Sequence, residues 1–273
     1  MRNLPFRRVW RQNSYKLNSA VNCERDLEDG MKVYRVLAVS LVLSVFSPWV
    51  QTVGAQVALP PGVSRRAVLE ASLGTPPPVG WKWQVQERTG PQATGALRHT
   101  NSGLYYTLEG THELVRGDTA QTFPGGQAVF VPAGVEHIHR MLPLGSTGRK
   151  FEVYFAPGDA SRPSPSGVRL LHFSEKAMDV RPGVTYTIRV TEVTFLPRAR
   201  RELTPSPPVI NYVLEGTKTR RVGDRAFRHE PGEVIELPVG TPFVAANEGT
   251  TPMRFLEVEL VLTPAPPSAP PRS

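Results

Sequence analysis

The stretch YTLEGT at residues 106–111 returns as YVLEGT at residues 212–217, which is 106 positions further along the chain. The same spacing relates a Gly-Asp pair, a single glycine and a Pro-x-Gly corner in the two copies. The matched positions are Gly117-Asp118 with Gly223-Asp224, Gly126 with Gly232, and Pro132-x-Gly134 with Pro238-x-Gly240. A register shared by apolar, glycine and proline positions indicates an internal repeat. The sequence therefore predicts two copies of one folding unit.

Each copy has the pattern of a small antiparallel β unit. Residues 104–108 and 209–214 are apolar-aromatic runs closed by Glu-Gly, and shorter runs bounded by turn residues follow. Glycine and proline supply the backbone conformations of tight turns, and short strands spaced about 8–12 residues apart are typical of sandwiches and barrels. The pattern predicts an all-β chain. The exception is residues 64–73 (SRRAVLEASL), where it predicts one short helix with Ser64 as the N-cap.

One motif in each copy is similar to a motif of the cupin superfamily, whose domains are small jelly-roll barrels. This motif runs from a glycine through five residues to Pro-x-Gly, two further residues and a histidine. Residues 126–137 (GQAVFVPAGVEH) meet it through His137, whereas residues 232–243 (GEVIELPVGTPF) end in Phe243. The chain thus resembles a two-barrel cupin, and the resemblance implies two tandem small jelly-roll β-barrels.

The barrels are expected at residues 80–158 and 180–264. We expect a linker with the short helix at 56–79, a second linker at 159–179, and a disordered tail at 265–273, since the last two segments are rich in proline and serine.

The resemblance also implies where metal ligands would lie in the first barrel. The family's other motif places a His-x-His pair at positions 97 and 99 and a glutamate at 103. Leu97 and Gly103 stand at two of these positions, so only His99 and His137 align with family ligands.

A geometric argument extends this set by two residues. Alternate residues of a strand share one face, so His139 is expected to face the same side as His137 and complete a three-His site. By the same alternation, Tyr105 is expected to line the cavity, with a hydroxyl able to donate a hydrogen bond to a ligand. Three neutral imidazoles can hold Zn, Fe, Mn, Ni or Cu and leave a coordination position open. The alternative is that the histidines are hydrogen-bonded pocket or core residues without a metal.

Two functions are compatible with these residues. One is small-molecule binding in the first barrel against His99, Tyr105, His137 and His139. The other is a metal-dependent enzyme, a dioxygenase or an isomerase by resemblance, with the three histidines as ligands and Tyr105 as proton donor. The sequence favours binding, because the missing glutamate removes both a charge that would neutralise the cation and a possible base.

The second barrel is expected to be metal-free. Its equivalents of the family ligands are Leu203, Pro205, Val209 and Phe243, whose side chains cannot bind such a cation. We expect this copy to be structural or to enclose a small apolar pocket. The remaining histidines considered, His172 and His229, are expected to be solvated.

The N-terminal region has the pattern of an export signal. Residues 36–50 (VLAVSLVLSVFSPWV) are apolar, follow Lys32 and Arg35, and precede the small residues 53–55 (VGA). A membrane-spanning helix needs about 20 apolar residues, so the shorter run predicts a signal peptide and a mature chain that begins at Gln56. The alternative is an N-terminal anchor. A start at Met31 instead of Met1 would give the signal an ordinary short basic beginning.

Composition limits the compartment and the partners. Cys23 is the single cysteine, so the mature chain would have none. The lack of cysteine, together with the abundance of proline and arginine, predicts a bacterial periplasmic or secreted protein. We expect no membrane insertion after cleavage. Eight of the 32 basic and four of the 24 acidic residues precede Gln56, which leaves a dispersed excess of four positive charges. We therefore expect no nucleic-acid partner. The expected state is a monomer with an internal pseudo-dimer, or a homodimer.

Overall fold

The computed structural model describes residues 58–91, 95–164 and 166–263, all of which fall within one compact unit. Over these ranges the chain is all-β, and no helix is present that is long and apolar enough to cross a membrane. The expected signal peptide, the cleavage before Gln56, the alternative starts at Met1 and Met31, and the expected tail lie outside the described residues.

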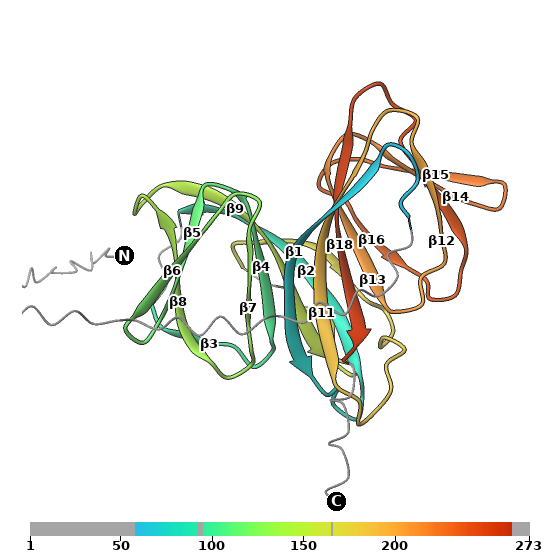
Figure 1. The fold of residues 1–273 in the computed structure, drawn as a ribbon. Coiled ribbons are helices and arrows are strands. Elements are labelled where there is room, and N and C mark those ends of the chain that lie inside the picture. The colour runs from blue at the N-terminus through green and yellow to red at the C-terminus, as the bar shows by residue number, and fades with distance from the viewer. Residues whose placement is uncertain (1–57, 92–94, 165, 264–273) are drawn as a thin grey trace, which may run out of the picture. The chain divides into compact units, whose positions relative to one another are not determined.

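The first barrel consists of a five-stranded and a four-stranded sheet (Figure 1), with strand orders β10-β2-β9-β4-β7 and β3-β8-β5-β6. Its strands are β2 (Trp81–Pro91), β3 (Leu97–Arg98), β4 (Gly103–Glu109), β5 (Thr111–Arg116), β6 (Thr119–Pro124), β7 (Ala128–Val131), β8 (Glu136–Leu142), β9 (Thr147–Pro157) and β10 (Arg169–Phe173).

The second barrel repeats this order strand for strand, as β1-β11-β18-β13-β16 and β12-β17-β14-β15. Its strands are β1 (Val63–Gly74), β11 (Tyr186–Phe195), β12 (Arg200–Leu203), β13 (Val209–Glu215), β14 (Lys218–Val222), β15 (Arg225–His229), β16 (Val234–Leu237), β17 (Phe243–Ala246) and β18 (Met253–Leu262). The predicted pair of tandem cupin-like barrels is confirmed. The strand pairings among the described residues are antiparallel, as in jelly rolls.

The Gly-Asp pairs of the repeat are hairpin turns, as predicted. Gly117 and Gly223 have φ values of 52° and 54° and begin the two-residue loops of β5–β6 and β14–β15. A positive φ at the first loop position suits glycine, which has no Cβ to clash.

The prediction of a helix at residues 64–73 is wrong, because this segment is part of strand β1. It pairs along most of its length with β11 and so joins the sheet of the second barrel, although it precedes the first barrel in the chain (Figure 1). The expected linker at 159–179 likewise contains β10, which pairs with β2 at the edge of the first barrel. Each repeat thus contributes its first strand to the other barrel. A distant pairing partner outweighs the weak local helix preference of residues 64–73.

The largest apolar core lies between the two five-stranded sheets. It contains Trp83 and Phe155 of the first barrel and Ile188 and Leu256 of the second, all at most 2% exposed. Because these sheets use their outer faces for this packing, their inner faces are available for polar side chains. The candidate site lies inside the first barrel, between the inner face of its five-stranded sheet and the four-stranded sheet that contains β8.

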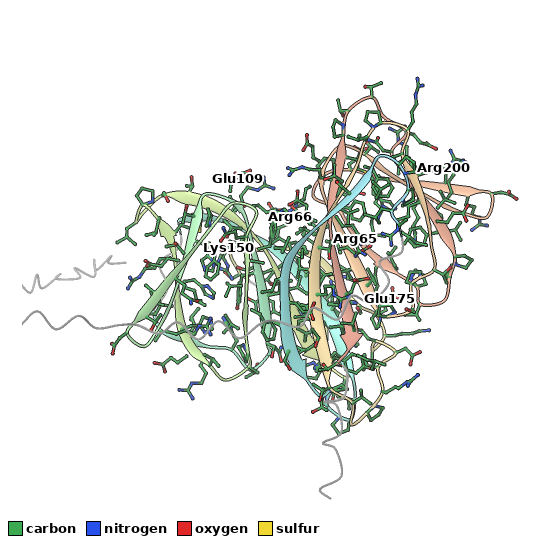
Figure 2. The ribbon with its side chains drawn as sticks, in the orientation of Figure 1. Arg65, Arg66, Glu109, Lys150, Glu175 and Arg200 are labelled. Carbon is green, nitrogen blue, oxygen red and sulfur yellow. The ribbon has the colours of Figure 1, made fainter. Side chains whose placement is uncertain are left out.

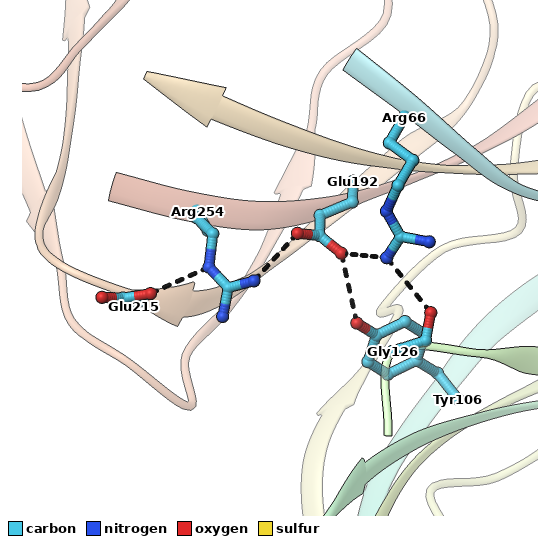
Figure 3. A network of polar contacts seen from close by, with 6 residues as sticks. All are labelled: Arg66, Tyr106, Gly126, Glu192, Glu215 and Arg254. Carbon is cyan, nitrogen blue, oxygen red and sulfur yellow. Dashed lines mark hydrogen bonds and ion pairs between the residues drawn. The ribbon is translucent and has the colours of Figure 1, made fainter. Parts of the chain in front are cut away.

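A polar network joins the barrels beside this core, and it occurs in two related copies. In one copy Glu192 accepts hydrogen bonds from Arg66, Arg254 and Tyr106, and Arg254 also donates to Glu215 (Figure 3). In the other copy Glu87 accepts from Arg169, Arg149 and Tyr212, and Arg149 also donates to Glu109. The arginine side chains are 35–61% exposed, so each ion pair adds little stability by itself. The geometry of the two networks instead fits a role in fixing the relative orientation of the two barrels.

Candidate functional site

Strand β8 carries two of the predicted site residues on its inward face. Burial alternates along it, so that His137 and His139 are 2% and 3% exposed while their neighbours are more accessible. The strand pairs with β5 without a register shift, which keeps the two side chains on one face. His99 follows β3, and a candidate ligand atom from each of the three imidazoles lies within 4.8 Å of the others. The structure therefore brings the three predicted histidines together.

Hydrogen bonds orient this cluster. The Nδ1 of His137 lies 2.8 Å from the carbonyl oxygen of Val135, a contact in which the ring nitrogen must donate. Its Nε2 then carries a lone pair, and the Nε2 atoms of His137 and His99 are buried without a hydrogen-bond partner among the described residues. Burial lowers the pKa of both imidazoles, which favours the neutral form. These buried, neutral imidazoles are suitable ligands for a metal ion that is coordinated by imidazole nitrogen.

A fourth histidine, which the sequence analysis missed, supports the cluster. His112 on β5 is fully buried, and its Nε2 lies 2.8 Å from the Nδ1 of His139. Burial, followed by the charge of Lys150, lowers the pKa of His112 to about 3. One signal was present: His112 follows the repeated Glu-Gly-Thr, and its equivalent 106 positions later, Lys218, is also fully buried.

Tyr105 lies in the same interior and explains the glycine at position 103. Its ring centroid is 4.5 Å from that of His139, and a Cβ added to Gly103 would lie 2.8 Å from the Tyr105 hydroxyl oxygen. The hydroxyl therefore lies in the space into which a side chain at position 103 would project. The family's glutamate cannot coexist with this position of Tyr105.

The facing sheet contributes a buried charged network. Glu152 on β9 is 1% exposed and accepts hydrogen bonds from Gln86, Arg88 and Tyr154, with Lys150 at 3.5 Å. Burial lowers the pKa of Lys150 to about 8, against the opposing effect of Glu152. Figure 2 labels Lys150 within the first barrel. No motif in the sequence pointed to these residues.

In the second barrel, the equivalents of the ligand positions are apolar or lack a donor. Val209 and Phe243 are buried in a separate core cluster, and Leu203 packs against it. Phe243 is paired with Leu203 across β12 and β17, so apolar surface fills the place that the histidines occupy in the first barrel.

His172 and His229 are not simply solvated, contrary to expectation. The Nε2 of His172 lies 2.6 Å from a carboxylate oxygen of Glu236, which also accepts a hydrogen bond from Ser174. The Nε2 of His229 is buried, and its Nδ1 lies 3.5 Å from Glu233.

Comparisons with known proteins agree on the fold. Residues 192–259 match the family described as Cupin domain. No curated protein sequence matches the chain. Among solved structures, AerE from Microcystis aeruginosa is similar with a TM-score of 0.50 and 14% identity over 75% of this chain and 95% of that one. Oxalate decarboxylase from Bacillus subtilis, a protein with Mn(II) centres, is similar with a TM-score of 0.46 and 14% identity, over 71% of this chain and 77% of that one. At these identities the likeness concerns the fold alone.

Proposed function

We propose that this chain, whose second barrel is a cupin domain and whose first barrel repeats the same fold, holds a divalent transition metal ion on His99, His137 and His139 and binds a small molecule beside it. The observation that carries the proposal is the convergence of three imidazoles within 4.8 Å, with two buried Nε2 atoms that no described residue satisfies. Hydrogen-bonded core histidines would be expected to have partners for these atoms.

The donor set narrows the choice of metal. It consists of imidazole nitrogen alone, which suits Zn, Cu, Fe and Ni better than Mn, since Mn prefers oxygen ligands. A metal ion bound there would act as a Lewis acid toward an oxygen or nitrogen of the ligand.

The protein's own groups prepare the site in three ways. Burial, followed by the charge of Lys150, lowers the pKa of His139, so this ring stays neutral, as a metal ligand must. His112 contacts the Nδ1 of His139 and holds the ring in place. Burial raises the pKa of Tyr105, so its hydroxyl keeps its proton and is a hydrogen-bond donor for a ligand.

Metal analysis of the purified, untagged protein tests the proposal. After incubation with Zn²⁺ and removal of excess metal, we expect about one ion per chain, because three ligands on a folded scaffold form a competent site. Substitution of His99, His137 or His139 by alanine is expected to lower occupancy at least about tenfold, since two imidazoles without a carboxylate hold metal poorly. His172→Ala is the matched control and should keep full occupancy. Wild-type protein that stays metal-free, or a loss equally large in the control, would overturn the proposal.

A catalytic use of the same site is the second candidate, and Tyr105 is the observation that favours it. Its buried hydroxyl lies beside the cluster and can donate a hydrogen bond to a substrate there, which is the contact that the expected proton donor of a dioxygenase or isomerase would need.

For the Tyr105→Phe variant, we expect normal metal content but about five- to tenfold weaker binding of azide to the Co²⁺-loaded protein, because one hydrogen bond is lost. The visible absorption of Co²⁺ during an azide titration measures this. Tyr186→Phe is the control, since the hydroxyl of Tyr186 accepts a hydrogen bond from the backbone N–H of Arg181, away from the three histidines. Equal azide affinity in wild type and Tyr105→Phe would remove Tyr105 from the site.

A further inference from the structure

The interior of the second barrel is charged, although its metal-ligand positions are apolar. Lys218 on β14 is fully buried, lies 3.9 Å from the centroid of the Phe255 ring, and donates a hydrogen bond to the side-chain oxygen of Asn211. A lysine is almost never fully buried unless it is paired. Its hydrogen-bond acceptor is a neutral amide, and the carboxylate whose charge acts on it is that of Glu257.

Several buried nitrogen atoms of this barrel lack acceptors. Among the described residues they are Nη1 of Arg201, Nδ2 of Asn211, Nε of Arg220 and Nε2 of His229. The first three can only donate hydrogen bonds, and the role of the His229 Nε2 depends on its tautomer. Within the described part of this barrel, no buried side-chain oxygen is similarly unsatisfied. Asn211 is fully buried, so its amide cannot turn to bulk water. Buried donors without acceptors are costly, and a surplus of them indicates that an acceptor-rich molecule belongs there.

A cavity of about 950 Å³ reaches one of these residues, Arg201. Arg65, Arg200, Arg201 and Glu202 line it together with Ala58, Leu59 and Pro60. Figure 2 labels Arg65 and Arg200, both on the second barrel. This volume is in the range of small-molecule sites.

Glu257 connects the cavity with the buried donors. It is the register partner of Asn211 and lies 2.5 Å from the Nη2 of Arg65, and its charge acts on both Arg201 and Lys218. Five cations and three carboxylates make up this set, so positive charge is in excess. The cations are Arg65, Arg200, Arg201, Lys218 and Arg220, and the carboxylates are Glu202, Glu257 and Glu259.

We propose that the second barrel binds an organic oxyanion, a carboxylate or a phosphate, through Arg201, Asn211 and Lys218. An oxyanion supplies acceptors for the unsatisfied donors and neutralises the excess positive charge. Guanidinium matches the planar carboxylate and the phosphate oxygens. This site is separate from the three histidines of the first barrel and needs no metal.

Calorimetric titration of the full-length protein tests the proposal. The protein is stripped with EDTA and carries His137→Ala and His139→Ala, so that an anion cannot bind through a metal in the first barrel. The probes are malonate and inorganic phosphate, which separate the two sources of oxyanion, and dimethyl malonate is the uncharged control. We expect one anion per chain with malonate or phosphate and no heat beyond dilution with the diester.

The Arg201→Gln and Lys218→Met substitutions are expected to weaken this binding at least about tenfold, because each removes a charge-assisted hydrogen bond. Arg225→Gln, an exposed arginine of the same barrel, should leave the affinity unchanged. Since Arg201 is half-buried, its variant should fold, and near-UV circular dichroism verifies this for all variants. Absence of binding by both anions, or equal weakening by Arg225→Gln, would overturn the proposal without affecting that for the first barrel.

Discussion

Replacing Glu152 with alanine is expected to lower the free energy of unfolding by about 3–5 kcal/mol, the usual cost of removing one partner of a buried ion pair. Glu152 and Lys150 are each 1% exposed and 3.5 Å apart. The variant would leave the Lys150 ammonium buried without its carboxylate, and would also remove the acceptor for Gln86 and Tyr154. Lys150 and Gln86 are buried, so bulk water does not replace the lost carboxylate.

Urea unfolding of the metal-free protein at pH 7 measures this effect. Glu113→Ala is the matched control, because Glu113 pairs with the more exposed Arg140 on the same barrel and should cost at most about 1 kcal/mol. The double variant Glu152→Leu with Lys150→Met should recover most of the lost stability, since an apolar pair can replace a buried ion pair. Equal losses for Glu152→Ala and Glu113→Ala would show that the network does not stabilise the barrel.

The second large effect on the free energy of unfolding is expected at Lys218, where substitution should stabilise the protein. Burial lowers the pKa of Lys218 to about 7, well below the value of 10.5 in an unfolded chain. Between these two pH values the unfolded state binds more protons than the folded state, so stability should rise with pH from about 7 to about 10.5. Below pH 7 the folded protein carries the full cost of a buried charge. Lys218→Met removes this cost and should raise the free energy of unfolding at pH 7 by a few kcal/mol.

The free energy of unfolding, measured from pH 6 to pH 10 in buffers without carboxylate or phosphate, checks both the pH dependence and the effect of Lys218→Met. The stability of the wild type should increase across this window by more than that of Lys218→Met. Lys176→Met, at an exposed position, should keep the wild-type profile. A Lys218→Met variant that is less stable than wild type at pH 7 would mean that the lysine is stabilised by its surroundings, and would contradict this account.

Local sequence patterns were sufficient for the fold of each barrel but not for the exchange of strands between them. The YTLEGT repeat and the Gly-Asp and Pro-x-Gly turns depend on short-range backbone conformations, and they predicted two copies of an antiparallel β unit. The resemblance to cupins made these two barrels, and both predictions are confirmed. Residues 64–73 have a helical pattern when considered alone. They form β1 because β11, more than a hundred residues away, offers a hydrogen-bonding edge. The local sequence of residues 64–73 does not indicate a pairing partner at that distance.

The candidate site divides in the same way. The prediction that His139 shares a face with His137 needs only the two-residue period of a strand, and β8 keeps that period. The argument for Tyr105 assumed a continuous strand from His99, whereas β3 ends at Arg98 and β4 begins at Gly103. Tyr105 nevertheless reaches the cluster, because closure of the barrel brings β4 and β8 to face one another.

The sequence alone was therefore enough to identify a repeated β-barrel chain with histidines in one copy and apolar residues at the matching positions of the other. It did not reveal His112, the Glu152 network or the buried lysine of the second barrel. Those depend on which side chains from distant strands share one interior and on how far that interior excludes water. Burial and charge pairing are properties of the assembled barrel, so only the tertiary structure could decide them.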